Sequence, residues 1–457
     1  MCPRSWTIAM LNGDRPLALR RLGRWLSPGM QLKRWLIMAF VGAFLFLDGF
    51  GRVLDSHFYN FHVNETIDRI AIEQARLSPA LLQWIFMIAG LALVYFGIRQ
   101  WMRSIVYALS PKDGSRLIEV IYERRQLDRG CRVVAIGGGT GLSTLLRGLK
   151  EYTSNLTAIV TVTDDGGSSG RLRQELGVLP PGDIRNCLVA LADSESTMTD
   201  LFQYRFNEGD GLSGHSFGNL FLAAMCGIAG DFDRAIKESS KVLNIKGRVL
   251  PSTLANVALH ATLADGTTVM GETAISRARS PIKTVSLAPP QCRPLSEAVD
   301  AIAAADVIIL GPGSLYTSIM PNLLVPGMVE AIAATNAVKI YVCNIMTQPG
   351  ETDDMAASDH VRTLLATGRS GLFDYALVNI EQPHRLLHAY ESEGAHQVEA
   401  DIDAVSALGI TPVTGRFVNE QLLVRHDSKK LGEAIAKLID ERADAIGLTS
   451  VRRPARV

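Results

Sequence analysis

The sequence lacks several patterns that would assign it quickly to a class of protein. Lysine plus arginine and aspartate plus glutamate are equal at 46 each in 457 residues, so the basic excess expected of a general nucleic-acid binder is missing. Six widely separated cysteines form no Cys-x-x-Cys pair, which argues against a zinc site, a redox motif or a disulfide framework. No internal repeat or low-complexity tract occurs. We therefore expect reduced thiols and no nucleic-acid partner.

Two long apolar runs, residues 35–54 and 79–98, distinguish the N-terminal part of the chain. Each is about 20 residues long, enough to cross a bilayer as a helix, although Asp48 interrupts the first. Basic residues cluster outside the pair, at Lys33, Arg34, Arg99 and Arg103, which favours a hairpin with both ends in the cytoplasm. A buried globular helix is the alternative for either run. We expect a basic cytosolic N-terminus (1–32), a transmembrane hairpin (33–98) and a juxtamembrane linker (99–130), which predicts a multi-pass protein of the cell membrane.

From residue 131 onward, strand-like runs alternate with helical patterns, which is typical of a parallel sheet covered on both faces. The clearest strands are 133–136, 158–163, 306–310, 339–343 and 375–378. Helical segments are expected at 142–149, 182–192, 216–227, 232–243, 295–304, 326–335 and 355–366. Asp265-Gly266 between two apolar runs predicts an inserted β-hairpin. The fold class predicted is α/β, with a Rossmann-like cytoplasmic domain over 131–447 and a tail over 448–457.

A glycine-rich turn follows the first strand and opens directly onto a helical segment. Such turns let backbone N–H groups approach a phosphate at a helix N-terminus, so the candidate nucleotide-binding residues are Gly137, Gly138, Gly139, Thr140 and Gly141. The run fits neither the Gly-x-Gly-x-x-Gly frame nor a Walker A loop, because Leu142, Ser143 and Thr144 stand where glycine or lysine would be needed. A purely structural turn is the alternative.

A second turn carries acids and hydroxyls after the strand that is expected to end at residue 163. Asp164 and Asp165 could hold Mg²⁺, accept from a ligand hydroxyl, or cap a helix, whereas Ser168 and Ser169 offer donors to a ligand. A third strand is followed by a turn containing Gly313 and Ser314. Because strand ends of a parallel sheet share one edge, we expect these turns to converge.

Two further motifs carry polar candidates. Arg185 and Asn186 lie one turn into the helix that begins near Asp183. Both side chains could face the crevice formed by the glycine turns. The Gly-x-Ser-x-Gly pattern at 214–218 matches a nucleophile elbow, but a polar glycine-rich loop precedes it instead of the strand that an elbow requires. We therefore interpret His215 and Asn219 as ligand contacts and assign no catalytic residue.

These motifs together resemble the bacterial gluconeogenesis factor family (YvcK-like), which is related to the 2-phospho-L-lactate transferases (CofD-like). The resemblance covers residues 131 to about 445 and rests on the segments 136–143, 163–173, 181–186, 213–220, 311–318 and 344–353. It implies a regulatory protein that binds UDP-N-acetylglucosamine or a related nucleotide sugar, with Tyr390 and Arg425 as further contacts.

The resemblance also implies a role in cell shape and peptidoglycan synthesis during growth on gluconeogenic carbon sources. Cell-envelope synthesis proteins are the partners expected from it, and homo-oligomerisation stays open. The membrane hairpin departs from the soluble members of the family. Two alternatives remain: a nucleotide-dependent transferase similar to the phospholactate enzymes, with Mg²⁺ as its cation, and a scaffold with a vestigial nucleotide pocket.

Overall fold

The computed structural model describes residues 32–53, 79–109, 125–193, 196–367, 371–421 and 423–446. The chain divides into two compact units, residues 1–121 and 122–457, and each is described by itself. The predicted basic segment before residue 32, the connection 55–78, the middle of the linker and the tail 448–457 lie outside the described residues.

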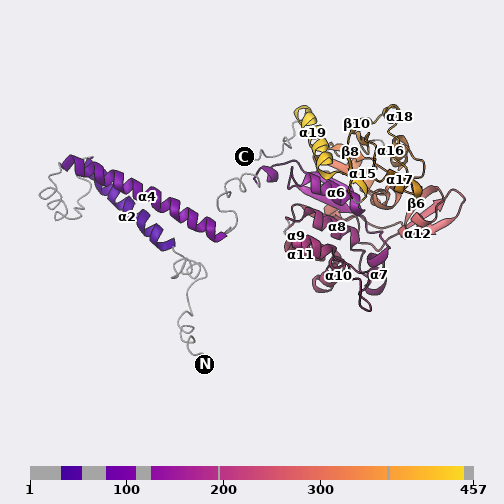
Figure 1. Cartoon of the computed structure of the whole chain (residues 1–457), viewed down its shortest axis with the longest axis horizontal. Helices are drawn as coiled ribbons and strands as arrows, with labels where there is room; N and C mark the ends of the chain where they lie inside the picture. Colours follow the sequence, from indigo (N-terminus) through magenta and orange to yellow (C-terminus); the bar gives the residue numbers. More distant parts are fainter. Residues whose placement is uncertain are drawn as a thin grey trace, which may run out of the picture. The chain divides into compact units, whose positions relative to one another are not determined.

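The N-terminal unit contains a pair of closely packed helices, α2 (Leu32–Val53) and α4 (Pro79–Leu109) (Figure 1). A Cβ atom added at Gly42 would lie 2.7 Å from the Gly90 carbonyl oxygen, so the glycines allow the backbones to meet. Large apolar side chains point outward, among them Phe40 and Ile88, which are 79% and 66% exposed. Within the described residues, one stretch is long and apolar enough to cross a membrane, Trp84–Ser104. The two-helix transmembrane hairpin therefore stays a prediction.

A seven-stranded sheet forms the centre of the second unit, and every neighbouring pair of its strands is parallel. This confirms the predicted α/β class. Its inner strands are continuous apolar runs because both faces of the sheet are covered. In spatial order the strands are β10 (Thr411–Gly415), β9 (Tyr375–Asn379), β8 (Val338–Val342), β7 (Val307–Leu310), β1 (Val133–Gly137), β2 (Leu156–Val160) and β3 (Arg248–Pro251).

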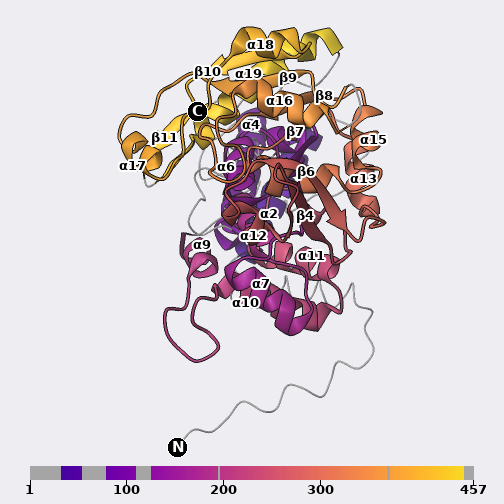
Figure 2. The same cartoon turned by 90° about the vertical axis from the view of Figure 1, so that its right-hand side faces the viewer.

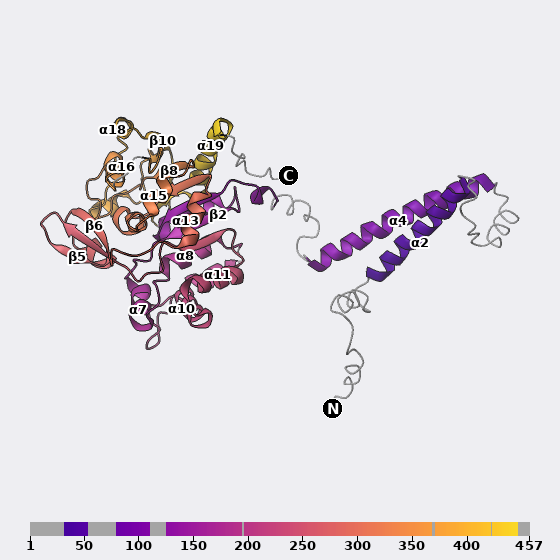
Figure 3. The same ribbon diagram turned by 180° about the vertical axis from the view of Figure 1, so that it is seen from behind.

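Helices cover the sheet in two groups. In the first group, α6 (Gly139–Leu149) packs against α8 (Gly182–Leu191) and α19 (Ser428–Ile446). In the second group, α13 (Ser296–Ala303) packs against α15 (Met328–Ala333). The view from behind shows α13 and α15 (Figure 3). The remaining helices are α7 (Gly167–Leu176), α9 (Ser196–Gln203), α10 (Phe217–Ala229), α11 (Phe232–Leu243), α12 (Glu272–Arg277), α14 (Met320–Leu323), α16 (Ala357–Leu365), α17 (Leu387–Ser392) and α18 (Ile402–Ala407), with a π-helical turn at Leu315–Ile319.

Two small antiparallel sheets are added to this framework. The predicted hairpin is confirmed as β4 (Ala258–Leu263) and β5 (Thr268–Met270), which β6 (Ile282–Ala288) extends to three strands. Gly266, with a φ of 86°, occupies the turn. A second ribbon, β11 (Val418–Glu420) with β12 (Val424–His426), was not predicted. It lies in contact with α6.

The order of strands reverses between β1 and β7. On one side of this point the chain runs outward through β1, β2 and β3, and on the other through β7, β8, β9 and β10. Where the order reverses, neighbouring connections leave in opposite directions and open a crevice at the carboxyl ends of the strands. The candidate site is therefore expected beside the ends of β1 and β7.

Candidate functional site

A cleft of about 350 Å³ lies at this point of the sheet, as the convergence of glycine turns predicts. The turn after β1 meets the turn after β7 so closely that a Cβ atom on Gly141 would lie 2.5 Å from the Pro312 carbonyl oxygen. Asn344, at the end of β8, holds the second turn: its Nδ2 donates to the Gly313 carbonyl at 2.9 Å. The volume is on the scale of a small-molecule site.

The other wall of the cleft comes from the C-terminal part of the domain. Tyr390 of α17 and Arg425 of β12 both line the cavity. The Tyr390 hydroxyl accepts from the Val424 backbone N–H at 3.2 Å, and a small apolar cluster packs α17 against the β11–β12 ribbon. Figure 2 shows α17 beside β11 at one side of the domain. The fold thus brings the predicted C-terminal residues to the same cleft as the glycine turns.

A carboxylate of the protein itself already lies against the glycine turn that follows β1. The Gly139 backbone N–H donates to Asp183, and a Cβ atom on Gly138 would lie 2.6 Å from Asp183 Oδ2. Burial, followed by the nearby Asp164 carboxyl, raises the pKa of Asp183 to about 6. Burial also raises the pKa of Glu272, which lines the same end of the cleft, well above its usual value. This end of the cleft is acidic.

The part of the cleft that Arg425 lines is basic. Arg425 is the cation there, and His426 beside it lines the same cavity. Burial lowers the pKa of His426 to about 4, so its imidazole is neutral at pH 7 and adds no charge. A ligand with an anionic part and an uncharged polar part would therefore be oriented by the cleft.

Eight of the predicted binding residues line the cleft: Gly138, Gly139, Thr140, Gly141, Gly313, Ser314, Tyr390 and Arg425. Gly137 is the last residue of β1, one position before the lining begins. Gly139 has a φ of 64°, a conformation that favours glycine. Thr140 and Gly141 lie in the first turn of α6, where backbone N–H groups have no partner within the helix, and both residues line the cavity.

The two adjacent aspartates bind to different elements. Asp165 Oδ1 accepts from the Thr273 backbone N–H at 2.9 Å and from its hydroxyl at 2.8 Å, so it anchors α12. Asp164 Oδ1 accepts from the Gly166 N–H at 2.8 Å. Neither lines the cleft, and within the described residues no group of three or more metal-ligating side chains is found. The Mg²⁺ site at this pair stays a prediction, and we derive no step through a metal.

The remaining predicted residues gather in a separate network between α7, α8 and α10. The Ser168 hydroxyl lies 2.9 Å from His215 Nδ1 and accepts from Asn219 Nδ2 at 3.1 Å. Arg185 donates to the Asn219 Oδ1 at 3.0 Å and to the Asn186 Oδ1 at 2.8 Å. Ser168, His215 and Asn219 are all buried, and none of the network's residues lines the cleft.

Ser169 serves the framework as well, because its hydroxyl accepts from the Gly182 N–H at the start of α8 at 3.1 Å. Among the features of the cleft that sequence reasoning missed are two lining residues, Glu272 and His426, and the hydrogen bond between the Asp183 carboxylate and the glycine turn, since the sequence placed Asp183 only at the start of a helix. For Asp183 alone a signal existed, since it falls within a motif of the resemblance.

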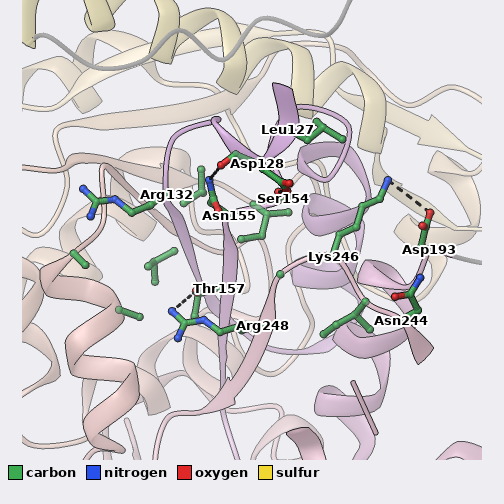
Figure 4. Close-up of a pocket in the computed structure, with 17 residues that line it drawn as sticks. Leu127, Asp128, Arg132, Ser154, Asn155, Thr157, Asp193, Asn244, Lys246 and Arg248 are labelled. Atoms are coloured by element: carbon green, nitrogen blue, oxygen red, sulfur yellow. Dashed lines mark hydrogen bonds and ion pairs between the residues drawn. The ribbon is translucent and has the colours of Figure 1, made fainter. Parts of the chain in front are cut away.

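A larger cavity of about 650 Å³ lies at the opposite, amino-terminal edge of the sheet, beside the first residues of β1, β2 and β3 (Figure 4). Most of its polar groups already have partners. Arg132 pairs with Asp306 at 2.7 Å, Lys246 lies 3.7 Å from Asp193, and Ser154 donates to Asp128 at 2.6 Å. The smaller cleft is the better candidate, because the glycine turns line it together with Arg425, for which the described residues provide no carboxylate partner.

Comparison with known proteins gives the family. The family model described as 2-phospho-L-lactate transferase CofD matches residues 133–418. A gluconeogenesis factor of Bacillus subtilis is 51% identical over 312 residues, covering 68% of this chain and 98% of the relative. The chain belongs to the CofD-like gluconeogenesis factor family. This confirms the resemblance found in the sequence motifs.

Relatives differ in how much of the chain they match. A gluconeogenesis factor of Halalkalibacterium halodurans is 52% identical and covers 66% of this chain and 95% of itself. A relative from Nostoc is 48% identical over 419 residues and covers 91% of this chain and 92% of itself. A crystal structure of a Bacillus halodurans protein, 52% identical, superposes with a TM-score of 0.66 over 67% of this chain and 99% of that chain. The domain therefore folds in that relative without the N-terminal unit.

The buried Asp183 carboxyl predicts a pH-dependent stability. Its folded pKa, about 6, lies above the ordinary 3.8, so its contribution is fully present below about pH 4 and is lost as the pH rises through 6. At pH 7 the loss amounts to roughly 3 kcal/mol at most. Asp183→Asn keeps an oxygen for the Gly139 N–H and cannot ionise. We expect the variant to be more stable than the wild type at pH 7.5, and the difference to shrink towards pH 4.5.

Urea unfolding at several pH values measures this difference. Asp300→Asn, at an exposed position of α13, is the matched control and should leave the pH profile unchanged. Other buried acids contribute to the wild-type profile, so the difference between variants is the quantity to compare. An Asp183→Asn profile parallel to that of the wild type would show that this carboxyl does not carry the shift.

Proposed function

We propose that this gluconeogenesis factor is a regulatory protein that binds a UDP-sugar, with UDP-N-acetylglucosamine as the leading ligand, and supports cell morphogenesis and wall synthesis during gluconeogenic growth. The observation that carries the proposal is the cleft between the ends of β1 and β7, where Tyr390 and Arg425 face the glycine turns. An aromatic ring and an arginine suit a base or sugar and a phosphate, respectively.

The chemistry of the cleft favours binding over turnover. Its lining contains hydroxyls, amides, an arginine and two carboxyl groups, and in the described part of the chain the one serine–histidine pair, Ser168 with His215, is buried in the separate network. A nucleophile must reach its substrate to act. The proposal also includes partners in envelope synthesis and self-association. These two parts rest only on the family resemblance.

Removing the Tyr390 ring should weaken nucleotide-sugar binding. We expect Tyr390→Ala to raise the Kd for UDP-N-acetylglucosamine about tenfold, because a stacked ring contributes roughly 1–1.5 kcal/mol beyond its area. Isothermal titration of the domain that begins at Tyr122 measures this Kd. Tyr204→Ala, which removes an exposed ring outside the cleft, is the control. Absence of any heat with the wild-type domain at millimolar ligand would refute the proposal.

We further propose that α2 and α4 anchor the protein in the cell membrane with the nucleotide-binding domain in the cytoplasm. The close glycine contacts between the two helices and their apolar outer surfaces support this. The full chain is expected in the membrane fraction, where detergent but not high salt releases it, and the domain from Tyr122 in the supernatant. Fractionation followed by immunoblotting checks it, and a full chain in the supernatant would contradict the anchor.

A transferase similar to the phospholactate enzymes is the alternative. The match to the CofD family model over residues 133–418 and the two carboxyl groups at the acidic end of the cleft favour it. The discriminating assay offers the domain a nucleotide-activated phospholactate, a deazaflavin acceptor and Mg²⁺. We expect no product; turnover that disappears in Asp183→Asn would replace the regulatory proposal with this one.

A further inference from the structure

A second, smaller cavity adjoins the candidate cleft on its basic side. It encloses about 280 Å³, and four residues line both spaces: Thr144, Leu423, Arg425 and His426. The other lining residues are Arg147, Asn419, Gln421 and Ser428. The two cavities share one wall and form neighbouring parts of one binding region.

The lining of this cavity contains two arginines and no acidic residue. Arg147 comes from the last turn of α6 and Arg425 from β12. Both arginines keep solvent-exposed side chains, so solvent screens part of their repulsion, and partial desolvation followed by the like charge of Arg425 lowers the pKa of Arg147. In the part of the chain that the structure describes, no carboxylate pairs with either guanidinium.

The acids nearest to Arg425 along the chain are engaged elsewhere. Asp427 Oδ1 accepts from the Lys429 and Lys430 backbone N–H groups at 3.0 and 2.9 Å and so caps α19. Glu420 accepts from the Arg385 backbone N–H at 3.1 Å. An arginine in the last turn of a helix can have no role beyond a favourable interaction with the helix dipole. That role does not explain why a second arginine without a carboxylate partner lines the same cavity.

Placing two like charges together without a counter-ion costs free energy, which an anion bound between them would offset. We propose that Arg147 and Arg425 form an anion subsite that takes the diphosphate of the nucleotide ligand, so that the phosphates lie in the smaller cavity rather than on the glycine turn. The inference rests on the proposed function. It also agrees with the position of Asp183, because a phosphate on the glycine turn would meet that carboxylate.

A nucleotide sugar has an uncharged part on each side of its diphosphate, and we assign its sugar to the larger cleft. Asp183 and Glu272 at its far end can accept from hydroxyl groups, which suits a sugar. Thr144 and Leu423 line both cavities at their junction. Arg147 thereby becomes a specificity-determining residue for phosphorylated ligands.

Titration calorimetry of the domain from Tyr122 with UDP-N-acetylglucosamine, and separately with inorganic pyrophosphate, tests the subsite. Arg147→Ala should raise the Kd for each ligand about tenfold or more, since a charge-assisted hydrogen bond is lost. Arg147→Lys should recover only part of the affinity, because lysine lacks the planar fork. Arg234→Ala, which removes an exposed arginine of α11, should leave both affinities unchanged.

A thermal melt without ligand provides the folding control. Arg147→Ala should melt at the same temperature as the wild type or higher, because a repulsion is removed. Wild-type binding of the nucleotide sugar with an unchanged Kd in Arg147→Ala would overturn the subsite while leaving the proposed function in place. If the nucleotide sugar does not bind, the proposed function fails, and pyrophosphate decides the subsite: binding that Arg147→Ala abolishes supports it, and no binding overturns it.

Discussion

The reversal of strand order between β1 and β7 is the constraint on which the rest of the domain depends. Right-handed crossovers place α6 and α8 on one face of the sheet, and the connections on the other side of the reversal leave towards the other face. The carboxyl ends of β1 and β7 thereby border the cleft. Because Gly141 has no side chain, the two turns can touch. The cleft therefore follows from the topology of the sheet and from this glycine.

Charge is distributed unevenly along this opening. Asp183 sits under the first glycine turn, and Glu272 adds a second carboxyl group at the same end. Two unit charges 4 Å apart near a protein surface interact with about 4 kcal/mol, so an anion close to an ionised Asp183 would be disfavoured. Arg425 lies where the cleft adjoins the second cavity, which neither acid lines. The cleft can therefore select the direction in which a polar ligand enters, as well as its size.

The sequence reveals the inner strands of the sheet but not its edges. β1 and β7 are covered on both faces and read as apolar runs, and β8 and β9 do so for most of their length. The prediction for β2, 158–163, began two residues and ended three residues after the strand Leu156–Val160. The missed strands, β3 and β10, are the two edge strands and contain Pro251 and Pro412. Proline is tolerated there because one side of an edge strand has no ladder partner.

Some features of the candidate site can likewise be predicted from the local sequence, whereas others depend on long-range contacts. A glycine turn before a helix is a local pattern, and topology brings such turns together, so Gly139 and Gly313 could be placed from sequence. Whether an exposed N–H meets a ligand or the protein's own carboxylate depends on a tertiary contact, and the Gly139 N–H meets Asp183. The residues that line the two cavities all fall between Gly138 and Ser428, within the second compact unit, residues 122–457. The chemistry of the cleft therefore belongs to the domain, and in the proposed arrangement the N-terminal helices would change where the domain acts rather than what it binds.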